Sequence, residues 1–258
     1  MEIQSSVGGI ALERVYVSSE RTWASQRSLG ASGGPYLARP FGAAAESRES
    51  LHWWHNFYSF VLPVASGSSE VWQVREGSGK LLEFTGCARS ATSCFAQPGA
   101  RSKETSSRLV WESTGSGTGY FVLHKPGEGR FFFESIWSPT GSASSPDTRY
   151  FLSRIEDTQH AAPGGLARTR ATLSYATPAG LTCPGLGAGP TAGVPFLYEV
   201  SSAEGTRLRF TYKKLPSARA EVGEECVLAN VSLVGTAGAT TSLVEYTVSV
   251  HGVWRPRA

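Results

Sequence analysis

The sequence has few charged residues and no long apolar or basic run, and these shortages exclude several classes of protein. Charged residues make up 17% of the 258 residues, against about 25% in a typical domain. A coiled coil, which needs Ala, Glu, Lys, Leu and Arg at helical period, is therefore disfavoured. No apolar run approaches the roughly 18 residues that span a bilayer. Lys and Arg never gather into a run of five to eight, so the net charge of +3 predicts no nucleic-acid partner and no membrane insertion.

The first residues, Met1–Ser6, lack the features of a secretory signal. They contain no basic segment and no apolar stretch of about 7–15 residues. The chain is therefore expected to stay inside the cell, to leave by a route without a signal peptide, or to begin partway into a longer polypeptide.

Cysteine is scarce, and its four positions do not form the Cys-x2-Cys pairs of a zinc ribbon. Cys87 and Cys94 flank a polar, turn-forming stretch, and this spacing suits a disulfide that closes a small loop. Cys183 lies in a Gly/Pro-rich segment and could then pair with Cys226. Two disulfides in an exported protein and four reduced thiols in a cytosolic one are almost equally favoured by this count, and four cysteines allow three pairings.

Short aromatic and β-branched runs are abundant, and they predict strands. Hydrophobic residues reach 40% and aromatic residues 11%, which is enough to build a core. In Arg207–Tyr212, Leu208, Phe210 and Tyr212 point to one side of a strand, while the arginines between them point to the other. Turn signals such as Pro126–Gly129 separate the runs. The remaining strand-like runs are Tyr120–Leu123, Arg130–Ile136 and Arg149–Ile155. The pattern predicts an all-β protein with long Gly/Ser-rich loops.

The run Leu51–Leu62 carries large apolar residues on both alternation faces, so we expect one central strand that is covered on both sides. Residues 178–195 are rich in Gly and Pro and form the best linker or loop candidate. They divide a block of strands over residues 1–177 from a smaller set of strands over residues 196–258.

Several segments together resemble the region that opens the repeat array of RHS/YD-repeat proteins. Leu12–Ser19 is similar to the opening Arg-x-Tyr strand of that family, and Arg149–Asp157 and Gly205–Tyr212 resemble degenerate YD units. The most specific part is the family-like core strand, which resembles a Trp-His-x-Asn segment and consists of Trp53, Trp54, His55, Asn56, Phe57 and Tyr58.

The resemblance implies a stacked or spiralling antiparallel strand array, with a β-sandwich as the alternative fold. It implies a secreted or cell-surface protein that forms part of a shell around an effector or toxin domain, and this chain lacks such a domain. Residues 196–258 would then be the start of a repeat array. The implied partner is the remainder of an RHS-type polypeptide or another β-edge, because an open last strand invites pairing.

No residue set is assigned to catalysis, metal binding or a cofactor. His52 and His55 would share a face on a helix, but on a strand they point to opposite faces, which disfavours a metal site. A glycoside hydrolase needs two converging carboxylates. A β-rich hydrolase is not excluded, because five carboxylates lie on or beside strand-like runs: Glu134, Asp147, Glu156, Asp157 and Glu199.

Two function hypotheses follow. The first is a non-catalytic structural module of RHS type. The second is a separate carbohydrate- or protein-binding β-sandwich, in which exposed aromatic rings such as Trp137 and Trp254 stack on a ligand.

Overall fold

The chain is an antiparallel β protein. The computed structural model describes residues 4–7, 10–16, 53–64, 71–77, 80–89, 93–98, 106–115, 118–137, 148–157, 168–176, 196–215, 225–235, 238–248 and 254–256. These ranges form nineteen strands, and the registers found in them are antiparallel. They hold no helix of the length and apolarity that crossing a membrane requires. The all-β class predicted from the sequence is confirmed.

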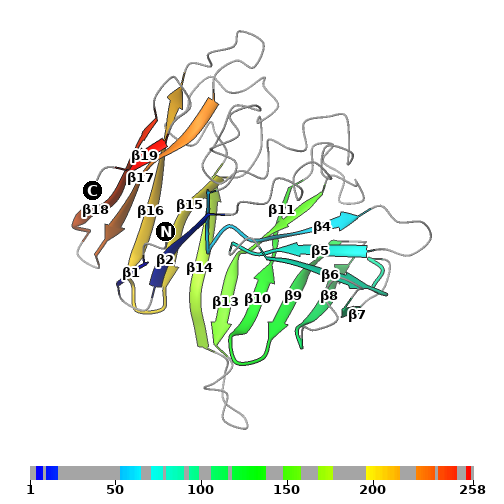
Figure 1. Cartoon of the computed structure of the whole chain (residues 1–258). Helices are drawn as coiled ribbons and strands as arrows, with labels where there is room; N and C mark the ends of the chain where they lie inside the picture. The colour runs from blue at the N-terminus through cyan, green and yellow to red at the C-terminus, as the bar shows by residue number, and fades with distance from the viewer. Residues whose placement is uncertain are drawn as a thin grey trace. The chain divides into compact units, whose positions relative to one another are not determined.

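The fold divides into two compact units, which are described separately. The insert unit comprises Asn56–Leu173, and the terminal unit comprises Met1–His55 together with Ser174–Ala258. The strands of the insert unit run from cyan to light green in Figure 1. The predicted linker at residues 178–195 lies outside the described residues.

Most neighbouring strands in the insert unit are also neighbours in sequence. The hydrogen-bonded order is β11-β12-β4-β5-β6-β7-β8-β9-β10-β13-β14, of which β14 belongs to this unit up to Leu173. The bounds are β4 Phe60–Val64, β5 Val71–Arg75, β6 Leu81–Thr85, β7 Ser93–Pro98, β8 Arg108–Gly115, β9 Thr118–Lys125, β10 Gly129–Phe133, β11 Ser135–Trp137, β12 Arg149–Phe151, β13 Arg154–Asp157 and β14 Arg168–Ala176. From β4 to β10 the chain therefore forms a meander, in which each strand pairs with the next.

Four aromatic rings from four strands form the centre of the insert unit. Trp72 of β5 and Trp111 of β8 lie 4.5 Å and 4.9 Å from the ring of Phe121 on β9. The Tyr150 ring of β12 lies edge-on to Phe121 at 5.0 Å. All four side chains are completely buried. Such pairs add about 0.5–1.5 kcal/mol each beyond the burial of their area. The cluster therefore holds β12 together with β5, β8 and β9.

One bent hairpin connects β11 and β12, at one end of the strand order, with β10 and β13, near its other end. Strands β10 and β11 form its first arm and β12 and β13 its second, because Phe132 pairs with Arg154 and Ser135 with Phe151 in one continuous register. At one end of the hairpin β10 pairs with β9, and at the other end β12 pairs with β4. The backbone N–H of Leu152, at the bend, donates to the carbonyl oxygen of Ser59.

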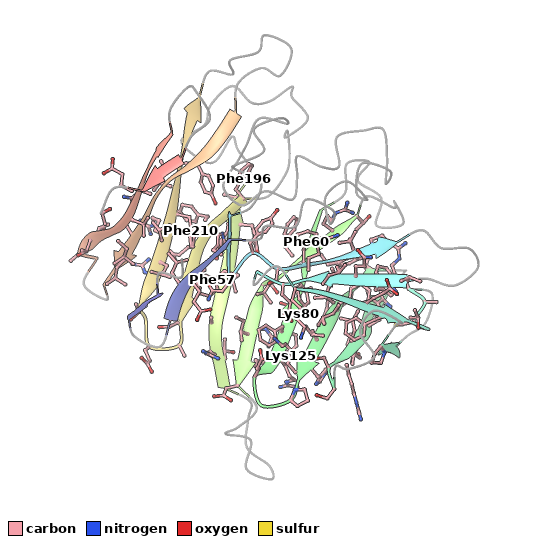
Figure 2. The ribbon with its side chains drawn as sticks, in the orientation of Figure 1. Phe57, Phe60, Lys80, Lys125, Phe196 and Phe210 are labelled. Carbon is pink, nitrogen blue, oxygen red and sulfur yellow. The ribbon has the colours of Figure 1, made fainter. Side chains whose placement is uncertain are left out.

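The terminal unit contains a three-stranded sheet and a meander. The order β1-β2-β3 joins Gln4–Val7, Ile10–Tyr16 and Trp53–His55, and the meander β15-β16-β17-β18-β19 joins Phe196–Ser202, Arg207–Leu215, Glu225–Val234, Thr240–Val248 and Trp254–Pro256. Leu208, Phe210 and Tyr212 are buried, as the alternation in β16 predicted. Figure 2 labels Phe210 on this strand.

The prediction of one continuous core strand over Leu51–Leu62 is wrong. The structure has two strands here, β3 and β4, separated by a turn at Asn56 and Phe57. The division between the two units falls at this turn. The expected burial is present, because His55 and the residues Phe57–Leu62 are all buried. A long apolar run can thus supply the cores of two units in succession, which periodicity alone cannot distinguish from one buried strand.

Gly119 gives the first testable prediction, because its missing side chain makes room for the core. A Cβ at this position would lie 2.6 Å from Cζ2 of Trp111 and would also meet the backbone oxygen of Glu112. We expect Gly119→Ala to lower the free energy of unfolding by about 1–3 kcal/mol through overpacking. The control is Gly235→Ala, where the nearest atom lies 3.8 Å away. Equal unfolding midpoints in urea for the two variants would contradict this account.

His55 gives a second prediction, on the pH dependence of stability. Its ring is completely buried on β3, 5.3 Å from the ring of Phe210, and burial lowers its pKa to about 3. Between pH 3 and about pH 6.5 the unfolded chain therefore binds a proton at this residue that the folded chain does not. The stability that His55 contributes is complete above pH 6.5 and is lost as the pH falls.

We expect the unfolding free energy of the wild type to fall by up to about 2 kcal/mol more than that of His55→Gln between pH 6.5 and pH 5. Urea titrations of both proteins at each pH measure this difference. Parallel pH profiles for the two proteins would show that His55 does not carry the effect.

Candidate functional site

Charged and aromatic side chains gather on one face of β8, β9, β10 and β13. In these strands, alternate residues such as Trp111, Phe121 and Phe133 enter the aromatic core. The residues between them, among them Arg130 and Phe132, therefore point to the opposite face. We call this opposite face the salt-bridged face.

Glu156 is the buried anion of the salt-bridged face. It lies on β13 and is 6% exposed. Its Oε2 accepts a hydrogen bond from Arg130, which stands directly opposite on β10, and its Oε1 accepts one from Arg154 two residues earlier. Both oxygens of the carboxylate are therefore engaged by guanidinium groups.

Glu134 is brought to the same arginine from the bend of the hairpin. Nη2 of Arg154 donates to Oε1 of Glu134 at 3.1 Å, and the Ser153 hydroxyl lies 2.8 Å from Oε2 of Glu134. Two of the five candidate carboxylates, Glu134 and Glu156, thus meet on one guanidinium.

Phe132 lies beneath the arginines. The guanidinium carbon of Arg154 lies 3.7 Å from the centre of the Phe132 ring, and that of Arg130 lies 5.6 Å from it. Phe132 packs with Val110 and Val122 in a small apolar cluster, against which Tyr120 rests. A cation over an aromatic ring contributes about 0.5–1 kcal/mol at an exposed site, so the arginines both pair with the carboxylates and cover apolar surface.

This geometry favours a structural role for the two carboxylates. A glycosidase needs one carboxylic acid that holds a proton and a second carboxylate that is free to act as base or nucleophile. Here Arg154 stands between the two groups, and charge-assisted hydrogen bonds occupy both oxygens of Glu156. The arrangement is that of an ion-pair ladder across β10 and β13.

The other candidate carboxylates lie elsewhere. Glu199, on β15 of the terminal unit, accepts a hydrogen bond from Arg209 at 2.8 Å and lies 3.7 Å from Arg207. Asp157 is half-buried at the end of β13. Asp147 lies outside the described residues.

Cys87 is joined in a disulfide. It is buried just after β6, and its carbonyl oxygen accepts a 2.8 Å hydrogen bond from the indole nitrogen of Trp72. In the part of the chain that the structure describes, β6 and β7 pair at Phe84 with Pro98 and at Thr85 with Gln97. Cys94 and Cys226 lie on β7 and β17 with side chains outside the described set, and Cys183 lies outside the described residues altogether.

The family-like aromatic residues divide between strand and turn. Trp53 and Trp54 lie on β3, and His55 ends that strand. Asn56 and Phe57 form the turn, and Tyr58 leads into β4, where its ring contacts Phe60 at 5.6 Å.

Trp137 ends β11 and Trp254 begins β19, but their side chains are not among those described. Within the described residues, no group of three or more His, Cys, Asp or Glu side chains could hold a metal ion.

One catalytic-type spacing is not among the candidates above. Gly30-Ala31-Ser32-Gly33-Gly34 has the glycine and serine spacing of a nucleophile elbow, which acts only in a strand–turn–helix context. The segment lies outside the described residues, so the spacing carries no assignment. The arginine–glutamate ladder was also missed, because Arg130 and Glu156 are 26 residues apart and only the hairpin register makes them neighbours.

Comparison with solved structures gives a likeness in fold. The chain is similar in fold to the N-terminal domain of the effector protein SpvB from Salmonella typhimurium strain LT2, with a TM-score of 0.54 and 14% sequence identity. The likeness covers 100% of this chain and 97% of that domain. No protein-family model matches the sequence, and no curated protein matches it either. At this identity the likeness shows the fold alone.

The ion-pair ladder gives a third prediction, which compares a Glu→Gln substitution at a buried position with the same substitution at an exposed one. Glu156→Gln leaves two arginines without their buried anion, and we expect a loss of about 2–4 kcal/mol of stability. Glu134→Gln removes an exposed partner of the same arginine, and we expect a loss of less than about 1 kcal/mol. Guanidinium chloride would screen these charges, so urea denaturation is the appropriate measurement. An equal loss from both variants would refute the assigned roles.

Proposed function

We propose that this chain is a non-catalytic structural β-module of RHS type, which forms part of a longer polypeptide that houses or delivers an effector or toxin domain. The observation that carries the proposal is the strand order, in which most strands within each unit pair with the next strand of the sequence. Such a meander can be extended strand by strand, as the RHS resemblance implies. The N-terminal position of the similar domain within an effector protein supports the same reading.

The state of the described carboxylates supports the absence of catalysis. Glu134, Glu156 and Glu199 each bind at least one arginine. These pairs stabilise strands and leave no free acid–base pair among the three.

The proposed location is outside the cell or at its surface. Disulfides form and persist in oxidising compartments, and Cys87 is disulfide-bonded. The proposed partner is the remainder of the polypeptide or another β-edge. The alternative is a separate binding module for carbohydrate or protein.

The fourth prediction concerns the native product. An antibody raised against the purified chain should detect, on a denaturing gel of the cells that express it and of their medium, a band far above 27.5 kDa. It should detect that product in the medium or on the cell surface. A band at 27.5 kDa would overturn the proposal and favour the separate binding module.

The alternative has its own assay. Tryptophan fluorescence of the purified chain, titrated with a set of polysaccharides, should show no saturable change if the module is structural. A saturable change that Trp137→Ala or Trp254→Ala abolishes would favour carbohydrate binding instead.

A further inference from the structure

Three basic side chains form a row across adjacent strands at one end of the salt-bridged face. Arg108 of β8 is the direct register partner of His124 on β9, and His124 is the direct partner of Arg130 on β10. The residues beside them in the first two strands, Leu109 after Arg108 and Leu123 before His124, are buried in the core. The three basic side chains therefore point to the opposite face. We call them the basic row.

This juxtaposition opposes protonation of His124, because a charged imidazole would face a like charge directly opposite it on each neighbouring strand, and such charges repel. Arg130 offsets part of this repulsion through its pair with Glu156. Neither the Arg108 guanidinium nor the His124 imidazole makes a hydrogen bond or ion pair in the described part of the structure. Nε of Arg130 is also buried without a hydrogen-bond acceptor there.

The electrostatic effect is visible at His124. Burial lowers its pKa, and the positive charges of Arg130 and Arg108 lower it further, while Glu112 on β8 opposes them. The groups that face His124 are thus Arg108 and Glu112 from β8 and Arg130 from β10. The positive field at the middle of the row exceeds what the one nearby carboxylate offsets.

We propose that the basic row is a binding site for a tetrahedral oxyanion, sulfate or phosphate, either free or as a monoester. Directly opposite residues have Cβ atoms about 4.5–5.5 Å apart, so the two arginines flank His124 at a separation of about 10 Å. Guanidinium groups match such oxyanions with paired N–H donors, and the imidazole adds a donor between them. This inference does not depend on the proposed function.

Protonation of His124 strengthens this site. A bound dianion favours the charged imidazole and raises the pKa of His124, so binding takes up a proton over the range in which free His124 is neutral. The affinity for inorganic sulfate, which stays a dianion throughout this range, should therefore rise as the pH falls from 7.5 to 5.5.

The experiment is calorimetric titration of the whole chain at both pH values. The probes are inorganic sulfate, inorganic phosphate, a sugar sulfate and a sugar phosphate. Equal affinity for ion and ester indicates a site for the free ion, whereas binding of the esters alone indicates a monoester ligand.

Three variants test the assignment. We expect Arg108→Gln to weaken binding about tenfold, the effect of one charge-assisted hydrogen bond. His124→Gln should abolish the rise in affinity at low pH. The control Arg170→Gln, at an exposed position on β14, should change the affinity less than twofold.

All three positions lie at least partly at the surface, so we expect each variant to fold, and circular dichroism checks this. In the wild type, the imidazole resonance that His124→Gln removes should titrate at a higher pH when the probe is present. The proposal is overturned if no probe binds more tightly than about 10 mM, or if Arg170→Gln weakens binding as much as Arg108→Gln.

Discussion

The insert unit depends on the packing of Trp72, Trp111, Phe121 and Tyr150. These rings come from β5, β8, β9 and β12, and their contacts bring together strands that lie up to 78 residues apart in the sequence. Burial of rings this large supplies most of the driving force in a small β core. The cluster also fixes details around it. Gly119 has no side chain because the Trp111 ring occupies that space, and Cys87 lies where its carbonyl oxygen meets the Trp72 indole.

The hairpin formed by β10–β11 and β12–β13 converts this core into an organised surface. Because Phe121 and Phe133 point inward, Arg130, Phe132 and Arg154 must point to the opposite face. There the arginines cover the Phe132 ring and bind Glu156 and Glu134. One face of the sheet is thus stabilised by ring packing and the other by charge pairs over a small apolar cluster. At the bend of the hairpin, the Ser153 hydroxyl forms a hydrogen bond with the Glu134 carboxylate.

Strand pairing and charge pairing account for the roles of the residues described above. Within each unit most strands pair with the next strand of the sequence, and three of the five carboxylates that could have formed a hydrolytic pair bind arginines instead. The similar fold of the SpvB N-terminal domain extends over the whole chain. The basic row differs from the rest of the salt-bridged face. In the row, the basic groups outnumber the carboxylates that pair with them, whereas elsewhere on the face arginines and glutamates are paired.

The sequence by itself determined the β class, the alternation of β16 and the turn at residues 126–129, because period-two patterning and turn chemistry are local properties of the chain. It also identified Glu134 and Glu156 as residues of interest, but it could not show that they share Arg154. The tertiary structure decided that pairing, the division of the Leu51–Leu62 run between two units, and the opposition of Arg108, His124 and Arg130. Each of these depends on the register between strands that are distant in sequence, and register is fixed by which side chains fill the common core.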